Sequence, residues 1–172
     1  MTSDPRFRVP LVLLVAVLVH TVVTSRVTVL GARPDVLLLV PIAAGLAGGR
    51  SRGAALGFAA GLAADVFLTS PMALSALVYS LVGYAVGLIQ GGLLALSPLF
   101  TVLTALGASA AGVLLYALAA GVLGQALVVG RLPVVVLVVA LVNALLGPPA
   151  LRAMRWAMGS ARLGRWQPSI QP

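Results

Sequence analysis

Long apolar runs dominate the chain and are interrupted by short polar breaks. Because a transmembrane helix needs about 20 predominantly apolar residues, each run is a candidate for a membrane-spanning helix. The breaks are rich in glycine, proline, serine and arginine, and glycine and proline in particular mark turns or end helices. The pattern predicts an all-α integral membrane protein with six transmembrane helices in one bundle. The runs cover residues 9–24 or 9–30, 36–48, 54–68, 72–89, 99–123 and 132–151.

The second and third runs are short, at roughly 22 Å each for a rise of 1.5 Å per residue. They are either two tilted spans, whose ends are extended by snorkelling arginines, or one re-entrant hairpin that does not cross. We expect two crossings, because a hairpin would place Arg50 and Arg52 deep in the bilayer or outside the cell. The second helix is expected to begin at Pro34, with Asp35 in its first turn, where a carboxylate complements the helix dipole.

The composition excludes a soluble domain and a disordered chain. Of the 172 residues, 61% are hydrophobic and 8% are charged, whereas soluble domains carry about 25% charged residues and disorder requires low hydrophobicity. The chain has no cysteine, which excludes disulfides, thiolate metal sites and cysteine catalysis. The net charge of +8 comes from arginines at the ends of the apolar runs. Membrane topology explains such a pattern better than nucleic-acid binding, and we expect no nucleic-acid partner.

The arginines predict the orientation, because cytoplasmic segments of membrane proteins carry an excess of basic residues. With six spans and an internal N-terminus, the cytoplasmic side would hold Arg6, Arg8, Arg50, Arg52, Arg152, Arg155, Arg162 and Arg165. The opposite side would hold Arg26, Arg33 and Arg131. We therefore expect a multi-pass protein of the cell membrane with both termini in the cytoplasm. Its predicted parts are an N-terminal stub (1–8), a transmembrane domain (9–152) and an arginine- and tryptophan-containing tail (153–172).

Two runs carry glycines at a spacing of four residues, which places them on one face of a helix. In the third run these are Gly53, Gly57 and Gly61, and in the fourth they are Gly83, Gly87 and Gly91. Such stripes allow two helix backbones to approach closely, which drives packing where lipid offers no hydrophobic contrast. We expect the stripes to pack within this bundle, and contact with a second membrane protein is the alternative.

Two acids are expected at the outer ends of adjoining helices. Asp65 continues the glycine stripe of the third run, and Asp35 begins the second. Intramembrane acids are costly and usually face protein or water. We expect Asp65 to interact with Arg33, Arg26 or the loop backbone. Contact with a partner or ligand and a role in a proton or ion relay are the alternatives.

The sequence offers no set of residues for catalysis or metal binding. The sole histidine, His20, lies inside the first run, and both it and Asn143 are expected to form hydrogen bonds within the bundle. One histidine and two acids do not have the spacing of metal ligands. We therefore expect no enzymatic activity, no cofactor and no metal. The prolines at 148–149 are expected to kink or end the last helix.

Three segments in register resemble the family of the rod shape-determining protein MreD. Residues 33–40 (RPDVLLLV) resemble the start of that family's second helix, and residues 57–65 (GFAAGLAAD) resemble its next segment. Residues 70–79 (SPMALSALVY) and the pair at 83–84 (GY) resemble the family's third segment. The resemblance covers roughly residues 31–92, and the remainder matches only in hydropathy.

The chain departs from the family pattern at Ala73, where a glycine is common, and at Pro41, where the run is usually uninterrupted. The resemblance implies a non-enzymatic membrane scaffold of the bacterial cell-elongation machinery, which binds MreC directly and helps to control cell shape and peptidoglycan synthesis. Its implied further partners are MreB, RodA and a class B penicillin-binding protein, whose contacts need not be direct. The positions that it assigns to shaping the bundle or contacting a partner are Pro34, Asp35, Gly57, Phe58, Gly61, Asp65, Tyr79 and Gly83.

The family's fold is similar to the six-helix substrate-binding components of energy-coupling-factor vitamin transporters. The alternative function is therefore a small-molecule, vitamin-type substrate-binding component of a membrane transporter. It predicts a polar cavity open to the outside, for which the sequence offers Asp35, Asp65, Tyr79, Tyr84 and Tyr116. It also needs a contact for a coupling module, often an alanine-rich motif on the first helix, whereas the first run here is rich in valine.

Overall fold

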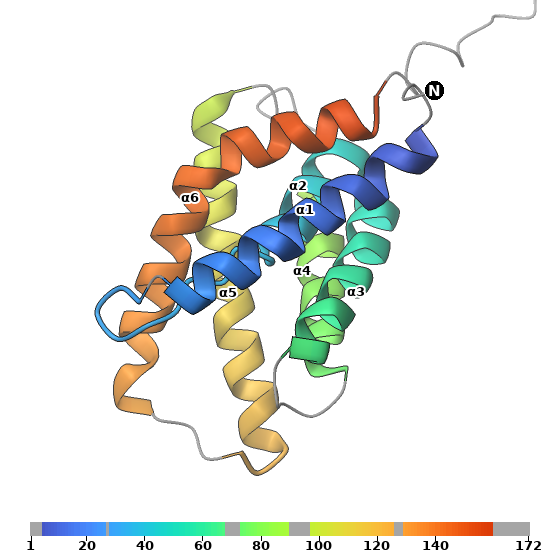
Figure 1. Ribbon diagram of the computed structural model, residues 1–172. Helices are drawn as coiled ribbons and strands as arrows, with labels where there is room; N and C mark the ends of the chain where they lie inside the picture. The colour runs from blue at the N-terminus through green and yellow to red at the C-terminus, as the bar shows by residue number, and fades with distance from the viewer. Residues whose placement is uncertain (1–4, 27, 68–72, 90–96, 126–128, 160–172) are drawn as a thin grey trace, which may run out of the picture.

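The computed structural model describes residues 5–26, 28–67, 73–89, 97–125 and 129–159. In this part of the chain the helices are α1 (Pro5–Arg26), α2 (Leu39–Gly48), α3 (Arg50–Phe67), α4 (Leu74–Ile89), α5 (Pro98–Val122), the 3-10 helix η2 (Val129–Arg131) and α6 (Leu132–Ala157) (Figure 1). The described residues form no β-strand, only an isolated bridge between Val29 and Ala32. The predicted all-α class and six main helices are confirmed. Residues 1–4 of the predicted stub and 160–172 of the predicted tail lie outside the described residues.

Two of the helices, α5 and α6, are long and apolar enough to cross a membrane. α2, α4 and the part of α1 from Phe7 to Val23 are shorter apolar helices. α2 is ten residues long, which corresponds to about 15 Å. Length and apolar composition alone therefore identify two of the six predicted spans.

α2 is the central helix of the bundle, and most of its side chains are buried. It packs against α3 and α4 on one side and against α5 and α6 on the other. α3 and α4 form one close antiparallel pair, and α5 and α6 form a second pair. α1 lies diagonally across the bundle, where it contacts α6 and α3 (Figure 1). The first helix is thus an outer cover over a core built around the second.

α2 begins at Leu39, so the prediction that it begins at Pro34 is wrong. Residues 33–36 have no regular secondary structure, and a turn at 37–38 leads into the helix. Asp35 therefore does not lie in a first helical turn. Pro34 is fully buried, so protein surrounds this non-helical stretch of backbone. The packing of this segment against neighbouring helices therefore outweighs the local sequence pattern that predicted a helix start at Pro34.

One residue, Gly49, separates α2 from α3, whereas the sequence predicts a break from 49 to 53. Arg50 and Arg52 belong to the first turn of α3. Gly49 has a φ of 80°, a left-handed conformation that glycine adopts without a Cβ clash. Its N–H donates to the carbonyl oxygen of Gly45 at 2.9 Å, and its own carbonyl accepts from Gly53 at 2.9 Å. The two helices are thereby joined by a very tight turn.

α6 continues through Pro148 and Pro149 and ends at Ala157. The prolines therefore do not end the helix. Figure 1 shows that α6 changes direction along its length, as the predicted kink requires, because proline removes a backbone hydrogen bond and its ring pushes against the preceding turn. The bend carries the last part of α6 over the end of the bundle where α1 begins.

The glycine stripes lie inside the bundle and bring α3 against α4. A Cβ on Gly53 would overlap the backbone carbonyl of Gly83, and one on Gly57 would overlap that of Tyr79. A Cβ on Gly61 would overlap the backbone of Ala76. Direct backbone-to-backbone contact of this kind is what small residues at a spacing of four permit. Packing within the bundle is therefore confirmed for the described glycines, while Gly91 lies outside the described residues.

Candidate functional site

A cavity of about 490 Å³ lies between α1, the segment before α2, α4, α5 and α6. Its size is within the range of small-molecule sites, roughly 300–1,000 Å³. The walls combine apolar side chains with a group of polar ones. The polar residues on the wall are His20, Thr21, Arg33, Asp35, Ser75, Tyr79 and Tyr116. Residues from the whole length of the chain thus meet at one place.

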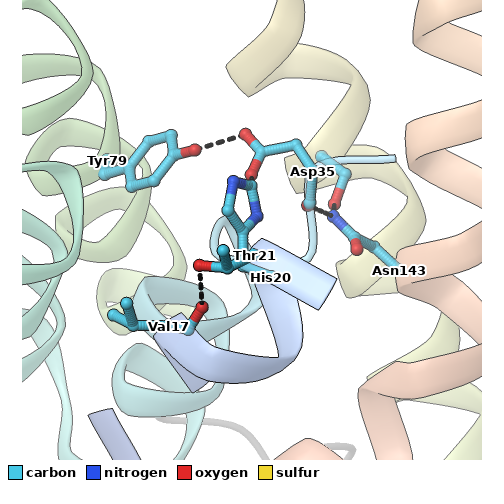
Figure 2. Close-up of polar contacts among 7 residues, drawn as sticks. Val17, His20, Thr21, Asp35, Tyr79 and Asn143 are labelled. Carbon is cyan, nitrogen blue, oxygen red and sulfur yellow. Dashed lines mark hydrogen bonds and ion pairs between the residues drawn. The ribbon is translucent and has the colours of Figure 1, made fainter. Parts of the chain in front are cut away.

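Asp35 is the centre of the polar group. The hydroxyl of Tyr79 on α4 donates a hydrogen bond to Oδ2 of Asp35. Oδ1 of Asp35 lies 3.6 Å from Nδ1 of His20 on α1. Figure 2 shows both side chains pointing toward the carboxylate from different helices. The acid therefore links the outer helix to the core, and the prediction that His20 faces the bundle is confirmed.

Asn143 on α6 forms a hydrogen bond with the backbone of the segment before α2, which contains Asp35. Its Nδ2 donates to the backbone carbonyl of Asp35 at 3.0 Å and to Oγ of Ser109 on α5 at 2.9 Å (Figure 2 draws the first of these). A buried carbonyl outside a helix needs such a donor, because an unpaired one costs free energy. The predicted role of Asn143 as an interhelical hydrogen bonder is confirmed. It also stabilises the non-helical backbone before α2.

Asp65 does not share this cavity. It is buried, and its two carboxylate oxygens accept hydrogen bonds from the backbone N–H groups of Ser75 and Ala76, each at 3.2 Å. These belong to the first turn of α4, where N–H groups have no partner within the helix. Within the described residues neither acid forms an ion pair with Arg26 or Arg33. Of the three partners expected for Asp65, which were Arg33, Arg26 or the loop backbone, the structure shows backbone, in the first turn of α4 that follows the loop.

The eight positions singled out from the sequence separate into three groups. Pro34, Asp35 and Tyr79 line the cavity. Gly57, Gly61, Gly83 and Asp65 lie along the contact of α3 with α4. Phe58 differs from all of them, because it points outward and is 49% exposed. The eight positions therefore do not form one site. Three line the cavity, four lie in the contact of α3 with α4, and one points away from the bundle.

Several wall residues were not among these eight positions. His20 and Ser75 lie on helices that show no cluster of polar residues, and only their isolation within apolar runs could have drawn attention to them. Of the residues considered for a transporter-type cavity, Asp35, Tyr79 and Tyr116 lie on the wall, and Asp65 and Tyr84 do not. The spacing of residues along the sequence could not predict that the fold places α1 over Asp35.

The chemistry that this arrangement supports is hydrogen bonding to a ligand or between helices. Within the described part of the chain, no three histidine, cysteine or acidic side chains gather as metal ligands. Asp35, His20 and Tyr79 can accept and donate hydrogen bonds next to an apolar wall. No strong nucleophile is on that wall.

Comparison with known proteins places most of the chain in a family. The model of the family described as "rod shape-determining protein MreD" matches residues 2–148. No curated protein and no solved structure matches the chain. The expected similarity to energy-coupling-factor components therefore stays a prediction. The family match extends from the start of α1 to the proline pair in α6.

Proposed function

Because the chain belongs to the MreD family of rod shape-determining proteins, we propose that it is a non-enzymatic membrane scaffold of the cell-elongation machinery. In this proposal it binds MreC directly and helps to control peptidoglycan synthesis. The observation that carries the proposal is the family match, which includes α1 to α5 and most of α6. The family is one of membrane proteins that act in shape determination. MreB, RodA and a class B penicillin-binding protein are proposed as further partners, through contacts that need not be direct.

The proposed topology has six crossings with both termini in the cytoplasm. Two observations support it. Arg8 near the start of α1 lies 4.9 Å from the ring centre of Trp156 near the end of α6, and the side chain of Arg52 lies beside Gly48, as does Met158. Arginines of the proposed cytoplasmic side thus gather at one end of the bundle, as the excess of positive charge on that side requires.

The proposed contact surface for a partner is the outward stripe on α3. Phe58, Leu62 and Val66 follow one another at a spacing of four and are 49%, 41% and 80% exposed. They lie next to the glycine stripe, which is itself occupied by contact with α4. An apolar side chain that faces out of a membrane bundle contacts either lipid or another helix, and aromatic residues including phenylalanine are enriched at the cores of protein interfaces.

The most direct test is co-purification of the tagged protein with MreC from detergent-solubilised membranes. We expect the wild-type chain to retain MreC and Phe58→Ala to retain at least severalfold less, since truncating a contact residue that contributes more than about 1 kcal/mol lowers the affinity about fivefold or more. Leu145→Ala on α6 is the matched control, because Leu145 is 79% exposed on another helix. Equal retention by all three proteins would remove the α3 surface from the proposal.

A cellular test addresses the function itself. Depletion of the protein should make rod-shaped cells round and disturb the insertion of new wall material. Unchanged shape together with unchanged wall insertion would contradict the scaffold function. Retention of a vitamin by the purified protein through gel filtration would favour the transporter alternative.

A further inference from the structure

We propose that the cavity around Asp35 is a binding site for a small molecule with an apolar body and a hydrogen-bond-donating end, a hydroxyl or an amine. This goes beyond the scaffold function and does not depend on it. The cavity of about 490 Å³ is large enough for such a molecule. A whole phospholipid with two acyl chains has a much larger volume, so the space fits a small ligand better than a lipid.

The recognising group is the carboxylate of Asp35. A carboxylate has about four sites that accept hydrogen bonds, and the side chain accepts one from Tyr79. Its Oδ1 is buried, lies 3.6 Å from Nδ1 of His20 and has no hydrogen bond within the described residues. The side chain as a whole is 28% exposed and lines the cavity, so a ligand reaches the carboxylate from the cavity side. Burying a carboxylate with few donors costs free energy. A ligand that brings an O–H or N–H group to Asp35 would recover part of that cost.

The rest of the cavity wall is mainly apolar, so the part of the ligand that contacts it should be apolar as well. Leu38, Val113, Val135 and Val139 come from the segment before α2, from α5 and from α6. Gly112 allows Leu38 to pack closely against α5 at this wall, since a Cβ there would lie 3.0 Å from the side chain of Leu38. The walls are therefore mainly apolar with a few convergent polar groups, which is the usual composition of a small-molecule site.

A negatively charged end is disfavoured, because like charges repel strongly where water is excluded. Arg33 is the cation at the edge of the cavity, and its side chain is exposed to solvent. An anion would be held by Arg33 at the rim rather than by Asp35 inside. A ligand with a hydrogen-bond donor at its end should therefore bind to Asp35 inside the cavity, whereas an anionic ligand should bind to Arg33 at the rim.

Because the chain has no cysteine, a single introduced cysteine can report on occupancy. In Val113→Cys the thiol would lie on the cavity wall, and its modification by methyl methanethiosulfonate is followed by mass spectrometry. The probes are 2-phenylethanol, 2-phenylethylamine and phenylacetate, which share an aromatic body and differ in the head group. Leu123→Cys, at an outward position that is 58% exposed just after α5, is the matched control.

We expect the alcohol and the amine to slow the labelling of Val113→Cys about tenfold at ten times their dissociation constants, by mass action. Phenylacetate should not slow it, and no probe should slow the labelling of Leu123→Cys. Adding Asp35→Asn should raise the half-protecting concentration of the amine by about tenfold or more, because a hydrogen bond to a charged acceptor is lost.

A second variant keeps the test independent of the stability of the Asp35 variant. Val135→Phe fills the cavity and leaves Asp35 in place, so protection of Val113→Cys by both donor probes should disappear. The proposal is overturned if the three probes protect equally, if they protect the control as well, or if none protects. Protection by added phosphatidylethanolamine without protection by either small donor probe would replace the small ligand with a lipid and also overturn it.

Discussion

The two sides of this bundle are held together in different ways. On one side, α3 and α4 meet backbone to backbone along Gly53, Gly57 and Gly61, with no space for an added methyl group. On the other side, α1, α5 and α6 line a cavity, where hydrogen bonds of Asn143 connect α5 and α6 to the segment before α2, and His20 on α1 lies 3.6 Å from Asp35. Close packing of small residues makes the first side rigid in shape. The second side combines apolar packing of α5 and α6 with a few polar contacts around a cavity, so it has room for a ligand.

The largest effect is expected from Gly61→Ala, which challenges the packed side. The new Cβ would overlap the backbone of Ala76, which cannot move aside like the end of a side chain. We expect a loss of about 3 kcal/mol in the free energy of unfolding, at the upper end for overpacking. Thermal unfolding of the purified protein in detergent would measure it.

Gly107→Ala on α5 is the matched control for this substitution, because a Cβ there has nothing within 4 Å. Alanine also has the higher helix propensity, by about 1 kcal/mol. The control should therefore be neutral or slightly stabilising. Equal destabilisation by both substitutions would mean that close approach of α3 and α4 does not decide the stability.

The next effect is expected from Asn143→Ala, which challenges the cavity side. It removes the donor to the carbonyl of Asp35 and to Oγ of Ser109. Leaving a buried carbonyl without a partner costs about 1–3 kcal/mol. Ser109→Ala removes only one of the two bonds and leaves the carbonyl paired, so it should cost less. If Ser109→Ala were as destabilising as Asn143→Ala in thermal unfolding, the bond to Asp35 would contribute little.

A smaller loss is expected from Asp65→Ala at the end of the packed side. The carboxylate accepts from two N–H groups in the first turn of α4, and removing an acceptor at a helix N-terminus typically costs about 0.5–2 kcal/mol. Asp65→Asn keeps one oxygen and should lose less. Thermal unfolding and MreC co-purification of both variants would separate stability from partner binding. Loss of MreC with unchanged stability would assign Asp65 to the partner instead.

The smallest effect, with the opposite sign, is expected from Ala73→Gly. Ala73 has a φ of 74° directly before α4, in the left-handed region that an alanine occupies only at a cost. Glycine lacks the Cβ that causes this cost, but it gains entropy in the unfolded chain. We expect a net gain of about 0.5–1 kcal/mol in thermal unfolding. A loss of stability would show that the conformation at residue 73 is not strained.

The sequence predicted the helices well, because long apolar runs leave a membrane chain few other ways to satisfy its backbone. Both the internal use of the glycines and the polar roles of His20 and Asn143 followed from spacing and from isolation in apolar runs. The left-handed backbone of Ala73 is a conformation that favours glycine. Ala73 was visible in the sequence, but its conformation was not.

The sequence by itself determined the class of protein, the number of helices and the side of α3 that packs on α4. These follow from composition and from periodicity along one helix, which are local properties. Only the tertiary structure decided that α2 begins at Leu39, that Asp65 binds backbone rather than arginine, and that Asp35 meets His20 and Tyr79 over a cavity. Each of these depends on which helices become neighbours. A buried polar group takes its partner from whatever lies beside it in space, and that is set by the packing of the whole bundle.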